Sequence, residues 1–157
     1  MSKKEVQKNG FNGLKILCVL SVIGFIASMY IDAGNYYLYS NIEQYLDVQD
    51  QELAENIEEK LSIFSEANVD VSEKGIDLLA WMFFGRGVLD VLALLGVMLM
   101  FYKLKIGFNL YVLFQLLYVV LPFILIGTGV NVVVPYELMM INLVYIALYV
   151  TQRKHLI

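Results

Sequence analysis

The chain has 157 residues, of which 59% are hydrophobic and 17% are charged, and its formal net charge is −4. With a mean hydropathy of +0.67, it is too apolar for an ordinary soluble domain, and its 11 basic residues are too few to indicate a nucleic-acid-binding protein. A single cysteine excludes an intramolecular disulfide, and a lone histidine, His155, excludes a zinc site built from His and Cys.

Four apolar segments account for most of the chain, at about residues 14–31, 78–102, 106–126 and 132–150. Each is close to the roughly 20 residues that an α-helix needs to cross about 30 Å of hydrocarbon. We therefore predict an all-α fold, a four-transmembrane-helix bundle that forms a single membrane domain over residues 1–157. The first segment also has the basic start and apolar core of a signal peptide. Because its apolar run is longer than usual for such a peptide, we expect it to remain uncleaved.

The charges between the apolar segments fall on two sides. Eight of the 11 basic residues lie before or at the very start of the first segment, between the second and third, or after the fourth. The connection 32–77 instead carries 12 acidic residues and only two lysines, Lys60 and Lys74. Short loops rich in Lys and Arg stay in the cytoplasm. Both termini are therefore expected in the cytoplasm, and the acidic loop is expected outside.

The acidic outer loop contains a predicted amphipathic helix. Ser40 and Glu43 have the spacing of a capping box, with Ser40 as the N-cap. An apolar stripe follows, made of Leu46, Leu53, Ile57, Leu61 and Phe64. We predict a helix over roughly residues 41–64 that packs this stripe on the outer ends of the bundle or, as an alternative, binds a protein partner. After it, Ser72 is the predicted N-cap of the second apolar segment. The acids lack the spacing of a calcium-binding loop.

Polar residues inside the predicted spans form a candidate intramembrane cluster: Arg86, Asp90, Glu137, Gln115 and Asn142. At 1.5 Å per residue from the cytoplasmic ends, Asp90 lies at about 18 Å, Glu137 at about 21 Å and Arg86 at about 24 Å. The two amides both lie at about 14 Å. Ionisable residues in the membrane are costly and mark functional sites by default. The alternative is structural: Arg86 neutralises the two carboxylates, and the amides hold helices together.

No motif in the sequence identifies a reaction. There is no phosphate-binding Gly-Lys-Ser/Thr loop, no His-Glu-x-x-His and no Gly-x-Ser-x-Gly. We therefore expect a non-catalytic protein without a metal or cofactor, an accessory or interaction protein whose acidic outer loop meets a partner. The alternative is a small proton-, ion- or solute-transporting protein that uses Arg86, Asp90 and Glu137. The lipid bilayer is a partner in both cases, and a homo-oligomer is compatible with either.

The predicted turn between the second and third segments, residues 101–111, has an aromatic start, two lysines and the sequence Gly-Phe-Asn-Leu-Tyr. It resembles a turn in small four-helix bacterial integral membrane proteins of unassigned function. The resemblance covers these residues only, and it implies a bacterial inner (plasma) membrane and no particular activity. Claudin-like four-helix proteins share a long first outer loop, but theirs carries a cysteine pair that this loop lacks.

Overall fold

The computed structural model describes residues 3–46 and 51–157, and this part of the chain is helical without strands. The α-helices are α1 (Lys3–Ser40), α2 (Ile42–Leu46), α3 (Gln51–Glu66), α4 (Glu73–Phe101), α5 (Lys105–Ile126), α6 (Val130–Val133) and α7 (Tyr136–Gln152). Two short 3₁₀ helices cover Gly127–Gly129 and Arg153–His155. The predicted all-α class is confirmed.

Three helical stretches are long and apolar enough to cross a membrane: Gly13–Ser40, Glu73–Phe101 and Lys105–Val133. Large apolar side chains cover their outward faces; Ile23 is 60% exposed and Ile124 is 72% exposed. An apolar surface of this extent marks contact with lipid. The chain is therefore an integral membrane protein. The predicted fourth segment differs from the other three, because the chain breaks around Pro135 and α7 has only 17 residues.

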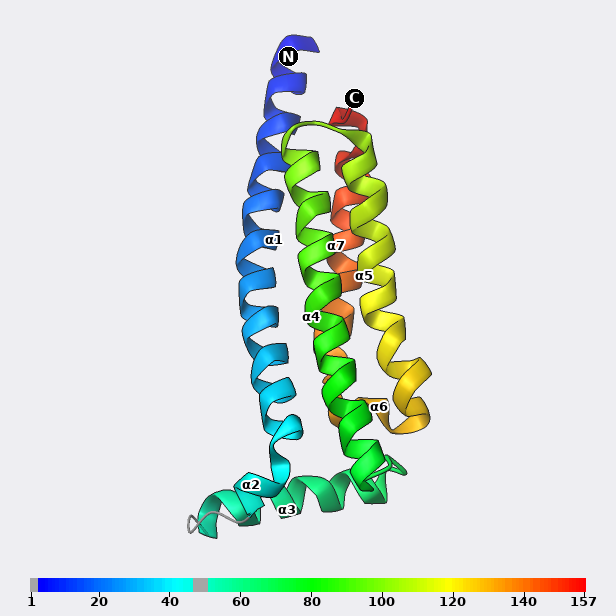
Figure 1. The fold of residues 1–157 in the computed structure, drawn as a ribbon. Helices are drawn as coiled ribbons and strands as arrows, with labels where there is room; N and C mark the ends of the chain where they lie inside the picture. Colours follow the sequence, from blue (N-terminus) through cyan, green and yellow to red (C-terminus); the bar gives the residue numbers. More distant parts are fainter. Residues whose placement is uncertain (1–2, 47–50) are drawn as a thin grey trace.

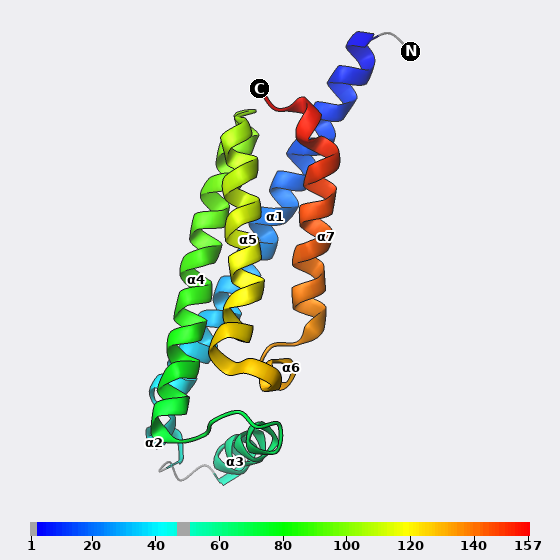
Figure 2. The same cartoon turned by 90° about the vertical axis from the view of Figure 1, so that its right-hand side faces the viewer.

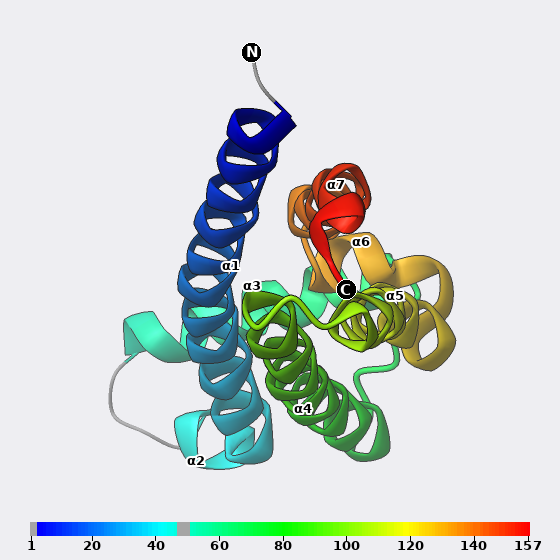
Figure 3. The same cartoon turned by 90° about the horizontal axis from the view of Figure 1, so that it is seen from above.

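The four longest helices, α1, α4, α5 and α7, run alongside one another, and α2 and α3 lie across one end (Figures 1 and 2). Seen along the bundle, α4 lies between α1 and α5 (Figure 3). Both termini lie at the end opposite α3 (Figure 1). There the Ile157 N–H donates to the Lys103 carbonyl at 2.7 Å, and the Lys105 N–H donates to the Ile157 carbonyl at 3.1 Å. The basic connections and the acidic loop thus occupy opposite ends of the bundle.

Helices α4 and α5 approach each other closely at two glycines. A Cβ atom added to Gly96 would lie 2.8 Å from both the Gly107 carbonyl oxygen and the Tyr111 nitrogen. A Cβ atom added to Gly107 would lie 2.5 Å from the Gly96 carbonyl oxygen. Small residues permit this kind of backbone contact between membrane helices. The backbones of α4 and α5 are therefore in close contact at these two glycines.

Helix α1 is longer than the sequence pattern indicates. The predicted span ended near Ile31 and Ser40 was the predicted N-cap of the next helix, whereas α1 continues to Ser40 as its last residue. Packing explains the extension: Tyr39 is buried, and its ring stacks on Phe83 of α4 with 5.6 Å between centroids. Tertiary contacts of this kind override weak local signals. As a result, Asp32 belongs to a bundle helix and not to the outer loop.

The predicted amphipathic helix corresponds to α2 and α3, and residues 47–50 between them lie outside the described residues. Ile57 and Phe64 are buried against the ends of the bundle helices, as the apolar stripe predicts, whereas Leu46 and Leu53 of the same stripe are exposed. Ser72 caps α4 as predicted, because its hydroxyl accepts a hydrogen bond from the Gly75 N–H at 3.3 Å.

Candidate intramembrane polar site

A polar layer lies between two apolar cores. The α3-end core includes Tyr39, Phe64, Leu79, Phe83 and Val130, and the terminal-end core includes Leu14, Leu17, Ala93, Val97 and Tyr149. On α4, Arg86 and Asp90 lie between the residues that belong to the α3-end core and those that belong to the terminal-end core. Gln115 and Tyr118 lie between the two cores on α5, and Asp32 lies between them on α1. Three helices therefore bring polar side chains to the same level of the bundle.

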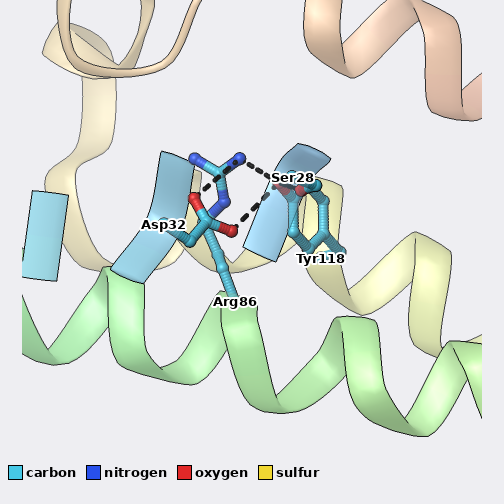
Figure 4. Close-up of polar contacts among 4 residues, drawn as sticks. All are labelled: Ser28, Asp32, Arg86 and Tyr118. Carbon is cyan, nitrogen blue, oxygen red and sulfur yellow. Dashed lines mark hydrogen bonds and ion pairs between the residues drawn. The ribbon is translucent and has the colours of Figure 1, made fainter. Parts of the chain in front are cut away.

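Arg86 forms an ion pair with Asp32, with 3.5 Å between Nη2 and Oδ1 (Figure 4). The Tyr118 hydroxyl joins the two groups: it accepts a hydrogen bond from Arg86 Nη2 and donates one to Asp32 Oδ2 at 3.2 Å. The Ser28 hydroxyl lies 2.8 Å from the Tyr118 hydroxyl. Because Tyr118 has one proton and gives it to Asp32, Ser28 is the donor in this contact.

Aromatic rings also hold the Arg86 guanidinium. Its carbon lies 4.3 Å from the ring centroid of Tyr118 and 5.5 Å from that of Phe83. A guanidinium over a ring face is attracted by the quadrupole of the ring, more so where water is excluded. The charge of Arg86 is therefore balanced by one carboxylate, one hydroxyl and two rings.

Several buried polar atoms in this layer have no hydrogen-bond partner. Asp32, Arg86, Asp90 and Gln115 are each at most 2% exposed. Five buried side-chain polar atoms without a partner are found in the described part of the chain, and four belong to these residues: Asp32 Oδ1, Arg86 Nε, Asp90 Oδ2 and Gln115 Oε1. Asp32 Oδ1 faces Arg86 as an ion pair, but at a distance too long for a normal hydrogen bond. Leaving such a group unsatisfied costs about 1–3 kcal/mol, and more if it is charged.

These residues surround a cavity of about 220 Å³. Its walls come from α1, α4, α5 and α7, and they include Ser28, Asp32, Arg86, Asp90, Gln115 and Asn142. The exposed residues in the lining, such as Gly24 and Ile31 of α1 and Ile141 of α7, belong to two helices only. The cavity therefore reaches the surface of the bundle between α1 and α7.

Four of the five predicted cluster residues, Arg86, Asp90, Gln115 and Asn142, line this cavity. Glu137 does not, because α7 begins at Tyr136 and places Glu137 in its first turn, where it is exposed. The carboxylate that pairs with Arg86 is Asp32, which the sequence pattern had assigned to the outer loop.

Sequence reasoning therefore missed Asp32 and Tyr118. A signal for Asp32 was present, because Ser21, Ser28 and Asp32 follow the spacing of one helix face. Tyr118 likewise lies three residues after Gln115 on the buried face of α5.

Within the described residues, no group of three His, Cys, Asp or Glu side chains could hold a metal ion. Comparison with known proteins finds no matching protein family, no similar curated protein and no similar solved structure.

Proposed function

We propose that this protein binds a small polar solute in the cavity between α1, α4, α5 and α7 and carries it across the membrane. The main support for the proposal is that Asp32, Arg86, Asp90 and Gln115 each have an unpartnered buried polar atom and all line one cavity. A cluster with a purely structural role is expected to satisfy its buried polar atoms, because unsatisfied ones destabilise the fold. All four residues line the cavity, and we propose that a bound solute supplies the missing hydrogen bonds.

The packing of the helices supports a movement of α7 relative to α1. Gly24 of α1 lines the cavity, and a Cβ atom added there would meet no atom within 4 Å. The α4–α5 pair, by contrast, is locked by backbone contact at Gly96 and Gly107. We propose that α4 and α5 form a fixed half and that α7 shifts to open the cavity. Such movements of packed helices are a common form of conformational change.

We also propose that α7 crosses the membrane, which makes the protein a four-transmembrane-helix bundle. Its 17 residues extend about 25 Å. The 3₁₀ turn Arg153–His155 continues the chain at one end and α6 precedes it at the other. The lysine distribution supports cytoplasmic termini. The resemblance of the 101–111 turn supports a bacterial inner membrane.

Cysteine accessibility tests the proposal without knowledge of the solute. In a Cys18→Ser background, Gly24→Cys places a thiol in the cavity, and Ile23→Cys places one on the adjacent exposed face. A carrier must release its solute to water, so its site must become accessible to water. We expect a charged, water-soluble thiol reagent to modify Gly24→Cys in proteoliposomes and to leave Ile23→Cys unmodified. Equal resistance of the two thiols would mean that the cavity is closed to water and that the cluster is structural.

The acidic face of α3 favours a second candidate, an interaction protein. Glu52, Glu55, Glu58, Glu59 and Glu66 are exposed, whereas Ile57 and Phe64 on the opposite side are buried. We propose that a basic partner would bind this face. The charge-reversed variant Glu55→Lys/Glu58→Lys/Glu59→Lys should then lose a protein that co-purifies with the wild type from its native membrane. Unchanged co-purification would contradict this candidate.

A further inference from the structure

The buried unpartnered atoms of the residues that line the cavity differ in whether they donate or accept hydrogen bonds. Three are hydrogen-bond acceptors, Asp32 Oδ1, Asp90 Oδ2 and Gln115 Oε1, and one is a donor, Arg86 Nε. An ionised carboxylate and an amide oxygen can only accept hydrogen bonds. A molecule that satisfies this set must therefore donate more hydrogen bonds than it accepts.

The charges of the site also favour an occupant that donates hydrogen bonds, and specifically a cation. Arg86 is already balanced by Asp32, Tyr118 and the Phe83 ring. With all three ionisable side chains charged, Asp90 leaves an excess of one negative charge. An anion in the cavity would face this carboxylate, and among the buried unpartnered atoms of the described residues it would find one donor, Arg86 Nε. A cation would instead meet an opposite charge in a water-poor site, where the attraction is strong.

The other residues of the cavity wall are mostly apolar, and they would contact the hydrocarbon part of an organic cation. Phe25, Tyr145, Leu138 and Ile141 line the cavity beside the polar groups. Aromatic rings in particular attract ammonium groups in desolvated sites. The volume of about 220 Å³ is smaller than the roughly 300–1,000 Å³ of pockets for drug-sized ligands. The occupant must therefore be small.

We infer that the solute is a small organic cation, a primary ammonium with an apolar body, whose N–H groups bind Asp90 Oδ2 and Gln115 Oε1. The ion pair of Arg86 and Asp32 stays intact beside it. The three protons of an ammonium match a site with surplus acceptors. This inference rests on the proposed function, which it narrows to one class of substrate. Water, which donates and accepts equally, is the competing occupant.

Three probes of nearly equal size and different charge test the inference: benzylammonium, benzyl alcohol and benzoate. Binding of each to the purified protein is measured by isothermal titration calorimetry. We expect saturable binding of benzylammonium, much weaker binding of the alcohol and no binding of benzoate. Asp90→Asn should weaken benzylammonium binding by about tenfold or more, because the negative charge that attracts the ammonium is removed. Gln115→Met, which removes an acceptor at similar volume, should also weaken it.

Glu137→Gln is the matched control, because it also neutralises a carboxylate on a bundle helix but lies outside the cavity. It should leave the affinity for benzylammonium unchanged. Equal or tighter binding of the alcohol or benzoate, no saturable binding of benzylammonium, or unchanged affinity in Asp90→Asn and Gln115→Met would overturn the inference. If Gly24→Cys is nevertheless open to the water-soluble thiol reagent, only the class of solute is wrong. If that thiol is as resistant as Ile23→Cys, the proposed function itself fails.

Discussion

Arg86 shows how one buried charge depends on residues far away in the sequence. Its guanidinium forms an ion pair with Asp32, donates a hydrogen bond to the Tyr118 hydroxyl and lies over two aromatic rings. Breaking a buried ion pair by removing one partner costs about 3–5 kcal/mol, because the other charge is left uncompensated. Removing both charges together is often nearly neutral.

We therefore expect Arg86→Leu to lower the free energy of unfolding by about 3–5 kcal/mol. The double variant Arg86→Leu/Asp32→Asn should recover most of that loss. Unfolding in detergent micelles, followed by circular dichroism, measures both values. Arg86→Leu/Glu137→Gln serves as the control, and it should recover nothing, because Glu137 lies outside the cavity. Equal rescue by both second substitutions would show that Asp32 is not the functional counter-ion of Arg86.

At the scale of elements, the contact of α4 with α5 depends on the absence of side chains. Both Gly96 and Gly87 lie inside α4, and replacing either by alanine raises the helix propensity by up to about 1 kcal/mol. Their surroundings differ, because a Cβ atom at Gly96 meets backbone atoms of α5 whereas one at Gly87 meets nothing within 4 Å. Backbone atoms cannot move aside as a flexible side chain can.

Gly96→Ala should therefore destabilise the protein by about 1–3 kcal/mol, the usual cost of overpacking. Gly87→Ala should be neutral or slightly stabilising. Parallel unfolding measurements in one detergent compare the two variants, and the shared gain in propensity cancels between them. A Gly96→Ala variant as stable as Gly87→Ala would indicate that α4 and α5 do not approach as closely as described.

The start of α4, by contrast, is fixed by a capping turn made of residues close together in the chain. The Ser72 N–H donates to Asp70 Oδ1 at 2.9 Å, and the Gly75 N–H donates to the Ser72 hydroxyl. The hydrogen bonds from the backbone and side chain of Ser72 hold the pKa of Asp70 below its usual value. Here the sequence pattern alone located the helix start, because the cap is made entirely by neighbours in the chain.

At the scale of the whole molecule, the proposed orientation in the membrane rests on the charges at the two ends of the bundle. In a Cys18→Ser background, Glu55→Cys on α3 and Lys154→Cys near the C-terminus both place a thiol at an exposed position. We expect an impermeant thiol reagent to modify Glu55→Cys in intact cells and Lys154→Cys only after permeabilisation, because lysine-rich ends stay in the cytoplasm. The reverse labelling pattern would invert the proposed topology.

The sequence by itself determined the all-α class, three helices long and apolar enough to span a membrane, the amphipathic α3 and the Ser72 cap. These features depend on hydropathy and on contacts between residues close in the chain. Only the tertiary structure decided where α1 ends, because the packing of Tyr39 on Phe83 keeps the helix intact beyond its apolar run. For the same reason it alone could pair Arg86 with Asp32, which lies 54 positions away in the chain. Depth counted along a helix places a residue at a level, but it does not show which way the side chain points. Glu137 matched Arg86 in estimated depth and lies outside the cavity, whereas Asp32 was counted with the loop and completes the site.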